Sequence, residues 1–209
     1  MKTFQYILFI LLILLSVGCS QNNDIVENKQ NGNSNENSIS EDLPENNKIY
    51  ATIAGEEITE EEVNFECFRA ELQNALANTT MNQTCPKEET IITQIIQLKA
   101  IDYLAVEKGV SATAEEVEKR LENIKKELAA SPIFQEKIKA YGEDKYWKHE
   151  EKRYYTIINS EKIKQSIVEK EKEKHSYLDE DALALAAKKE FDDLVVEAVG
   201  LMDVQVIKE

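Results

Sequence analysis

Apolar residues recur every third or fourth position along most of the chain, which is the spacing of helices that bury one face. Residues of the types that cap or open helices precede each apolar run. The pattern predicts six successive helices, which begin near Thr59, Pro86, Thr113, Pro132, Gly142 and either Asp179 or Asp181.

The predicted helices differ in how much apolar surface they carry. The second has apolar residues on more than one side between positions 91 and 105, so we expect it to be the central helix, covered on two sides. The third has a single narrow stripe and is expected to lie on the surface. Residues 162–174 are dense in Glu and Lys, which predicts an exposed continuation of the fifth helix.

Two short segments at the ends of this region have the alternating pattern of strands. Residues 49–53 alternate apolar and polar or amphipathic side chains, and Ala54-Gly55 then predicts a tight turn. Val204, Val206 and Ile207 predict a terminal strand. Because a lone strand leaves its main-chain groups unpaired, we expect the two segments to pair with each other. The fold class is therefore mostly α, a multi-helix domain over residues 48–209 with a small two-stranded pairing.

Two helix starts carry a particularly specific signal. Thr59 precedes Glu62 by three residues, and Thr113 precedes Glu116 by three, which is the spacing of a capping box. Gly109 supplies the matching signal for a helix end, because glycine readily adopts the left-handed conformation of a Schellman motif.

The first 47 residues have a different character from the rest. Residues 1–18 contain a short polar start and an apolar run of signal-peptide length, and residues 15–19 (Leu-Ser-Val-Gly-Cys) resemble the lipobox of bacterial lipoproteins. This resemblance implies that Cys19 is the lipid attachment site and that the mature protein is anchored on the outer face of the cell membrane. An ordinary secretory peptide or an uncleaved anchor are the alternatives. Residues 19–47 are rich in Asn, Ser and Glu, which predicts a disordered tether.

Composition restricts the classes of partner. The net charge of -15 argues against binding to nucleic acid and against adhesion to anionic lipid. Cys67 and Cys85 lie in the first predicted helix and just before the second, so a helical hairpin can bring them together. In an oxidising compartment they can form a disulfide or remain two thiols, and neither has the neighbours of a zinc site.

We find no constellation of catalytic residues in the sequence. His149 and His175 are the only histidines, and both lie in charged stretches where a solvated helix face is the simpler interpretation. Phosphate-binding loops and serine nucleophile motifs do not occur. We therefore predict that the protein is not an enzyme and uses no cofactor or metal.

An aromatic cluster in the fourth and fifth predicted helices is the main candidate for a binding surface. Tyrosine and tryptophan combine a large apolar area with a polar tip, so such a cluster can form a cradle for unfolded polypeptide. Core packing is the competing interpretation. The residues concerned are Phe134, Tyr141, Tyr146, Trp147, Tyr154 and Tyr155.

The order of these parts resembles the N-terminal domain of the SurA/PrsA/trigger-factor type of chaperones and foldases. The resemblance rests on the opening strand, turn and acidic helix start at residues 50–62, on Lys108-Gly109-Val110, and on the Thr-Ala-Glu-Glu-Val-Glu stretch at 113–118. It covers roughly residues 50–164. Active foldases of this type insert a parvulin-like isomerase domain before the last helix, whereas residues 169–181 leave no room for one.

The resemblance implies a chaperone module without the catalytic domain. We therefore expect a lipid-anchored extracytoplasmic protein that binds unfolded or translocating polypeptides without isomerase activity. A surface adaptor that holds one specific folded partner is the main alternative, and a prolyl isomerase is a further one.

Overall fold

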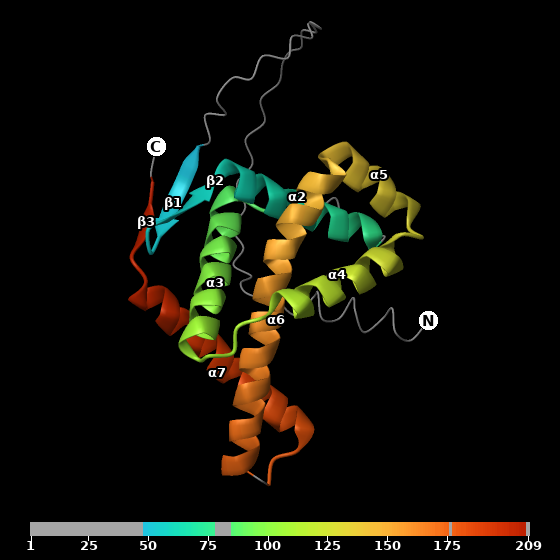
Figure 1. Ribbon diagram of the computed structural model, residues 1–209. Coiled ribbons are helices and arrows are strands. Elements are labelled where there is room, and N and C mark those ends of the chain that lie inside the picture. Colours follow the sequence, from blue (N-terminus) through green and yellow to red (C-terminus); the bar gives the residue numbers. More distant parts are fainter. Residues whose placement is uncertain (1–47, 78–84, 176, 208–209) are drawn as a thin grey trace, which may run out of the picture. The chain divides into compact units, whose positions relative to one another are not determined.

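The computed structural model describes residues 48–77, 85–175 and 177–207, which form six helices and a three-stranded antiparallel sheet (Figure 1). In chain order these are β1 (Ile49–Ile53), β2 (Glu56–Thr59), α2 (Glu60–Leu76), α3 (Glu88–Glu107), α4 (Ala114–Leu128), α5 (Pro132–Tyr141), α6 (Glu143–Lys174), α7 (Glu180–Leu201) and β3 (Val204–Val206). This architecture confirms the predicted mostly α class. The predicted signal peptide (1–18), the lipid attachment at Cys19 and the tether (19–47) lie outside the described residues.

The sheet contains the predicted pairing of the two terminal segments. β1 pairs antiparallel with β3, with Thr52 opposite Gln205. The expectation of only two strands is wrong, because β2 pairs with the other edge of β1. Ala54 and Gly55 form a two-residue loop in which φ is 50° and 83°, and this sign of φ at both positions is what a type I′ hairpin requires. The glutamates of β2 have low strand propensity, which hid this strand in the sequence.

Local hydrogen bonds define the helix ends as the sequence predicts. The N–H of Glu62 donates to Thr59 Oγ1 at 3.4 Å, and the N–H of Thr59 donates to Glu62 Oε2 at 3.1 Å. Thr113 and Glu116 form the same capping box at the start of α4. At the end of α3, the N–H groups of Gly109 and Val110 donate to the carbonyls of Val106 and Ala105, which is a Schellman motif.

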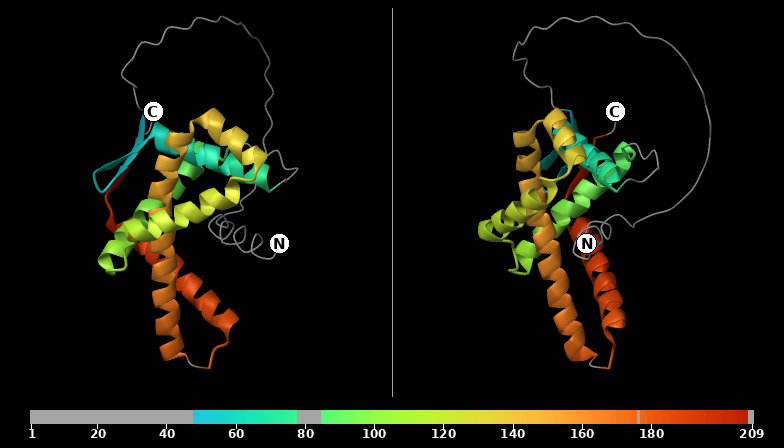
Figure 2. Two further views of the ribbon diagram at one scale, coloured as in Figure 1. Left: turned by 45° about the vertical axis from the view of Figure 1, so that its right-hand side comes forward. Right: turned by 90° about the vertical axis from the view of Figure 1, so that its right-hand side faces the viewer.

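The core is built around α3 and α6. The second helix, α3, contacts α2, α6, α7 and β1, as predicted for a central helix. The 32-residue helix α6 contacts α3, α4, α5 and α7, and α6 and α7 run side by side in both views of Figure 2.

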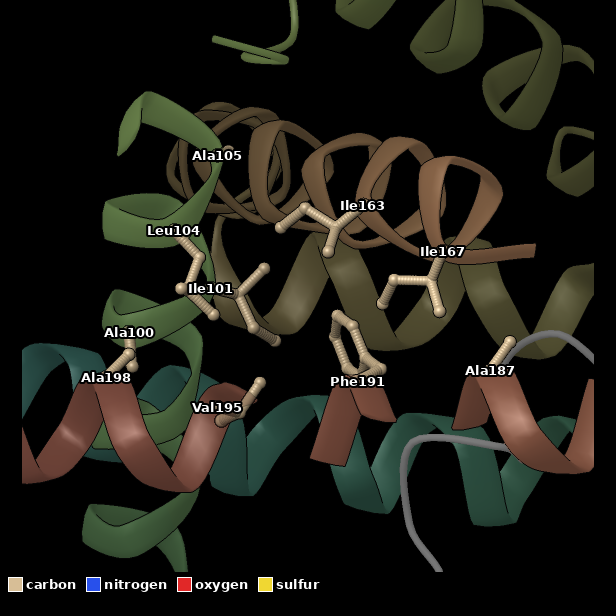
Figure 3. Packing of buried hydrophobic residues seen from close by; sticks show 10 residues of the cluster. All are labelled: Ala100, Ile101, Leu104, Ala105, Ile163, Ile167, Ala187, Phe191, Val195 and Ala198. Atoms are coloured by element: carbon tan, nitrogen blue, oxygen red, sulfur yellow. The ribbon is translucent and has the colours of Figure 1, made fainter. Parts of the chain in front are cut away.

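The charged C-terminal half of α6 is not simply exposed, which corrects the prediction for residues 162–174. Most of its lysines and glutamates face solvent, but Glu171 is buried and Ile163 and Ile167 are fully buried. Figure 3 shows these two side chains directed toward Phe191 of α7, with Ile101 of α3 beside them. The apolar positions in this stretch are four residues apart, so they lie on one helix face despite the charged residues around them.

We expect replacement of Phe191 by alanine to destabilise the domain strongly. Phe191 is buried where α3, α6 and α7 meet, so Phe191→Ala removes a large side chain and leaves a cavity that costs about 3–5 kcal/mol. The matched control on the same helix is Leu185→Ala, where the native side chain is 70% exposed. Urea unfolding followed by circular dichroism measures both free energies, and equal values for the two variants would contradict this packing.

Candidate functional site

A groove of about 650 Å³ lies between α3 and α6 in the described residues, and we call it the α3–α6 groove. The turn after β1 and the residue that follows α7 line one part of it, and α2 contributes a further wall. Its lining residues are Ile53, Ala54, Glu56, Glu62, Phe65, Glu66, Ile95, Leu98, Lys99, Asp102, Tyr103, Val106, His149, Lys152, Arg153, Tyr155, Thr156 and Met202.

The α3 wall of the groove is a single helical stripe. Its residues follow the three-and-four spacing that places side chains on one face, and they are Ile95, Leu98, Lys99, Asp102, Tyr103 and Val106. Toward the C-terminal end of this stripe the side chains become exposed: Tyr103 is 37% exposed and Val106 is 69% exposed. The groove therefore presents uncovered apolar surface within a concave site.

The α6 wall carries polar side chains at the same spacing. His149, Lys152, Arg153 and Thr156 face the groove from successive turns of α6. Arg153 Nη1 donates to Glu66 Oε1 of α2 at 3.0 Å, while the buried Nε of Arg153 has no partner among the described residues. Burial lowers the pKa of Arg153, and the charge of Glu66 opposes that shift. The α3 wall of the groove is thus mostly apolar, apart from Lys99 and Asp102, and the α6 wall is mostly polar.

A half-buried carboxylate joins the two walls. Asp102 of α3 accepts hydrogen bonds from Thr156 Oγ1 at 2.7 Å and from Asn159 Nδ2 at 2.8 Å, both on α6. Burial raises the pKa of Asp102, and the two hydrogen bonds partly offset this effect. The Oδ1 of Asn159 in turn accepts a hydrogen bond from the N–H of Ala112 at 2.6 Å. These bonds fix the separation of α3 and α6 at one side of the groove.

A second polar contact fixes α2 against α6. Arg69 Nε donates to Glu150 Oε1 at 2.7 Å, and the two side chains are 11% and 4% exposed. Burial alone lowers the pKa of Arg69, but the charges of Glu150 and Glu66 outweigh it and raise that pKa. Because α2 and α6 both line the groove, this ion pair helps to hold its walls in place.

His149 is not the solvated residue that the sequence predicts. Its side chain is 11% exposed, its ring stacks on Phe65 with centroids 4.6 Å apart, and its Nε2 lies 2.9 Å from Glu61 Oε1. The hydrogen bond with His149 lowers the pKa of Glu61, and the charge of Lys145 adds to this effect while burial opposes it. The charged neighbours of His149 in sequence concealed an inward-facing position. His175, by contrast, has an exposed side chain.

Three of the six residues of the aromatic cluster are core residues, so the six side chains do not together form the predicted exposed cradle. Phe134, Tyr146 and Tyr154 are buried, and burial together with the charge of Glu150 raises the pKa of both tyrosines. The helical spacing along α5 and α6 directs these side chains toward α2 and α4 rather than toward solvent.

The other three members of the cluster are partly buried. Tyr141 stacks on Phe68 with ring centroids 4.3 Å apart, and burial raises the pKa of Tyr141 to about 12. Trp147 packs edge-on against Tyr146 and lies beneath the ammonium group of Lys125, 4.7 Å from the ring centre. Tyr155 is the only one of the six that lines the α3–α6 groove. The candidate binding surface therefore moves from the cluster to the groove.

The two cysteines of the domain are joined. Cys67 of α2 and Cys85, which precedes α3, form a disulfide with their Cα atoms 4.9 Å apart. Both are partly buried against the cluster that includes Ile91 and Ile95 of α3. The disulfide therefore ties two helices that line the groove.

Sequence reasoning missed the groove, although one signal for it was present. The sequence shows that α3 carries more apolar surface than a single contact needs, and the prediction of a central helix covered on two sides leaves none of that surface for a ligand. Leu98, Tyr103 and Val106 supply the excess. The polar residues opposite them belong to a helix that lies about 50 positions later, so no local pattern could have paired the two walls.

No group of three or more metal-binding side chains occurs in the part of the chain that the structure describes. Among the described helices, none combines the length and the apolar content that a membrane crossing requires. The sequence matches no model of a known protein family, and no curated protein matches it.

We expect the loss of one partner of the Arg69–Glu150 pair to destabilise the domain more than the loss of both partners, as is typical of a buried ion pair. Glu150→Leu leaves the guanidinium of Arg69 buried without its carboxylate, which costs about 3–5 kcal/mol of unfolding free energy. The double variant Arg69→Met/Glu150→Leu removes both charges and should recover most of that loss. The control is Asp193→Ala, which breaks an exposed pair with Lys189 and should leave the unfolding free energy nearly unchanged. A loss below about 1 kcal/mol for Glu150→Leu would show that the pair does not hold α2 to α6.

Proposed function

We propose that this protein binds extended, apolar segments of other polypeptides in the α3–α6 groove. The observation that carries the proposal is the uncovered apolar side of α3, where Tyr103 and Val106 face a concave site while most other apolar side chains of the helix are packed. Burying that surface under a ligand releases about 25 cal/mol for each Å² of apolar area removed from water. A ligand with aliphatic or aromatic side chains gains most from this contact.

The size of the groove suits a short stretch of chain. Its volume of about 650 Å³ lies within the ordinary range of ligand sites and accommodates a few side chains rather than a folded domain. An extended chain advances about 3.3 Å per residue, so only a few residues occupy the groove at one time. Such a contact is weak and reversible, and it tolerates many sequences.

An extended ligand also needs hydrogen-bond donors for its main-chain carbonyl groups, and the α6 wall can supply them. Lys152 is exposed on α6 and forms no ion pair with the residues described here, so its ammonium group is available to a ligand. Glu56 and Glu62 are already held by Lys99, at 3.0 Å and 3.6 Å. The α6 side of the groove therefore favours ligand carbonyls over ligand ammonium groups.

The sequence supplies a cellular setting for this activity. The lipobox resemblance at Cys19 and the tether at residues 19–47 support a mature protein that is anchored on the outer face of the membrane. The resemblance to the SurA/PrsA/trigger-factor type of chaperone domain supports the binding of unfolded or translocating secreted polypeptides. The function we propose is therefore that of a chaperone-like, extracytoplasmic lipoprotein that acts without an isomerase domain.

A comparison of two exposed apolar residues tests the proposal. Residues 20–209, without lipid, are added in increasing amounts to a denatured secreted protein as it is diluted from denaturant, and aggregation is followed by light scattering. We expect the native sequence to suppress aggregation and Val106→Asp to lose most of this effect, because the carboxylate must be desolvated when a ligand fills the groove. Leu185→Asp should behave as the native sequence does, because Leu185 is equally exposed but lies outside the groove.

Two outcomes would contradict the proposal. No suppression at any ratio would exclude a general affinity for unfolded chains and would favour the adaptor that holds one folded partner. Equal losses in Val106→Asp and Leu185→Asp would show that exposed apolar area, rather than the groove, is responsible.

A further inference from the structure

The outer edge of β3 presents main-chain groups that the sheet does not use. The N–H of Ile207 donates to the carbonyl of Tyr50 and the N–H of Ala54 donates to the carbonyl of Asp203, both at 2.9 Å. Main-chain groups alternate in direction along an antiparallel strand. The N–H and C=O groups of Val204 and Val206 therefore point away from β1, and no strand in the described part of the chain pairs with them.

The inner face of the sheet remains apolar up to this edge. Ile58 on β2 and Ile53 on β1 are covered completely, Val204 on β3 is partly covered, and Val206 is 53% exposed. Figure 1 shows β3 at the rim of the sheet, with β1 between it and β2. The apolar face thus continues one strand beyond the part that the helices cover. An added strand could place its alternate side chains against this uncovered surface.

The two edge strands of the sheet, β2 and β3, differ in charge, which affects their ability to pair with another chain. On β2 the exposed side chains of Glu56 and Glu57 place charge on the outer strand, which is a common protection against pairing with another chain. β3 carries Val-Gln-Val and no charge. The end of α7 just before it adds the exposed apolar residues Val196 and Leu201. Within the described residues, the β3 edge therefore combines unpaired main-chain groups with a strand that carries no charge, and the nearest carboxylate, Asp203, precedes the strand and accepts a hydrogen bond from Gln205.

A second copy of this chain is a poor occupant for the β3 edge. Stable protein pairs bury about 1,200–2,000 Å² in total, whereas β3 has only three residues. Each copy also carries a net charge of -15, so two copies repel one another. A single extended segment of another protein needs only the row of main-chain groups and a few apolar contacts.

We propose that the free edge of β3 pairs with an extended, apolar, non-acidic segment of a partner polypeptide, which adds a fourth strand to the sheet. This interaction is separate from the α3–α6 groove and does not depend on it. The main-chain hydrogen bonds provide most of the affinity and are indifferent to sequence, while contact with Val206 and Ile207 favours β-branched side chains.

A labelled peptide tests this inference with the full chain in a mild detergent. The probe is a short peptide of alternating valine and threonine with a lysine at each end, and fluorescence anisotropy measures its binding. A second peptide has the same side chains but carries N-methyl groups on alternate amides. The methyl groups replace the N–H hydrogens that would otherwise donate to the carbonyl groups of β3. We expect the methylated peptide to bind at least about tenfold more weakly, because each lost hydrogen bond costs about 1 kcal/mol.

Variants of the protein test the same hydrogen bonds from the side of β3. Val206→Pro removes the outward N–H but none of the hydrogen bonds to β1, and proline is tolerated at such edge positions. Val206→Thr keeps the N–H and the β-branched shape and serves as the matched control. We expect Val206→Pro to weaken binding of the unmodified peptide about fivefold, and Val206→Thr and Val106→Asp to leave it nearly unchanged. Thermal unfolding shows whether each variant retains its fold.

Each contrary result has a definite meaning. Equal binding of the methylated and unmodified peptides would overturn the proposal even if Val206→Pro fails to fold. Loss of binding in Val106→Asp would assign the peptide to the groove instead. A dimer of the native chain that Val206→Pro abolishes would make a second copy the occupant and would also overturn it.

Discussion

The fold depends on the burial of α6, a single helix of 32 residues that contributes to three separate apolar clusters. Tyr146 packs with α2 and α5, Tyr154 packs with α4, and Ile163 packs with α3 and α7. A shorter or broken helix could not fix all of these neighbours relative to one another. Because one stripe of the same helix forms the polar wall of the groove, the geometry of the site follows directly from this packing.

Charged residues lie between the apolar clusters and connect the helices that form the walls of the groove. Arg69 with Glu150 and Arg153 with Glu66 connect α2 to α6, and Asp102 connects α3 to α6. Buried pairs of this kind add little net stability, but they penalise any arrangement in which one partner is left alone. We infer that they hold the helices in register, so that α3 can leave Tyr103 and Val106 uncovered without the apolar side of the groove collapsing.

The sequence predicts the parts of this structure that depend on local signals, and it predicts little of the site. Capping boxes at Thr59 and Thr113 and the Schellman motif at Gly109 are set by neighbouring residues, so their positions are predictable. The pairing of β1 with β3 follows from the rule that main-chain groups need partners. The inward position of His149, the burial of the aromatic cluster and the groove itself depend on which helices meet, and residues far apart in the sequence decide that.

The most direct measurement of polypeptide binding in the groove is photo-crosslinking to a denatured secreted protein. A photoreactive benzoylphenylalanine is placed either at position 103, in the groove, or at position 177, where the native tyrosine is 79% exposed outside it. If the groove binds extended polypeptide, position 103 gives the higher yield of crosslinked client although Tyr103 is the less exposed residue. A yield at position 177 that equals or exceeds the yield at position 103 would contradict the account.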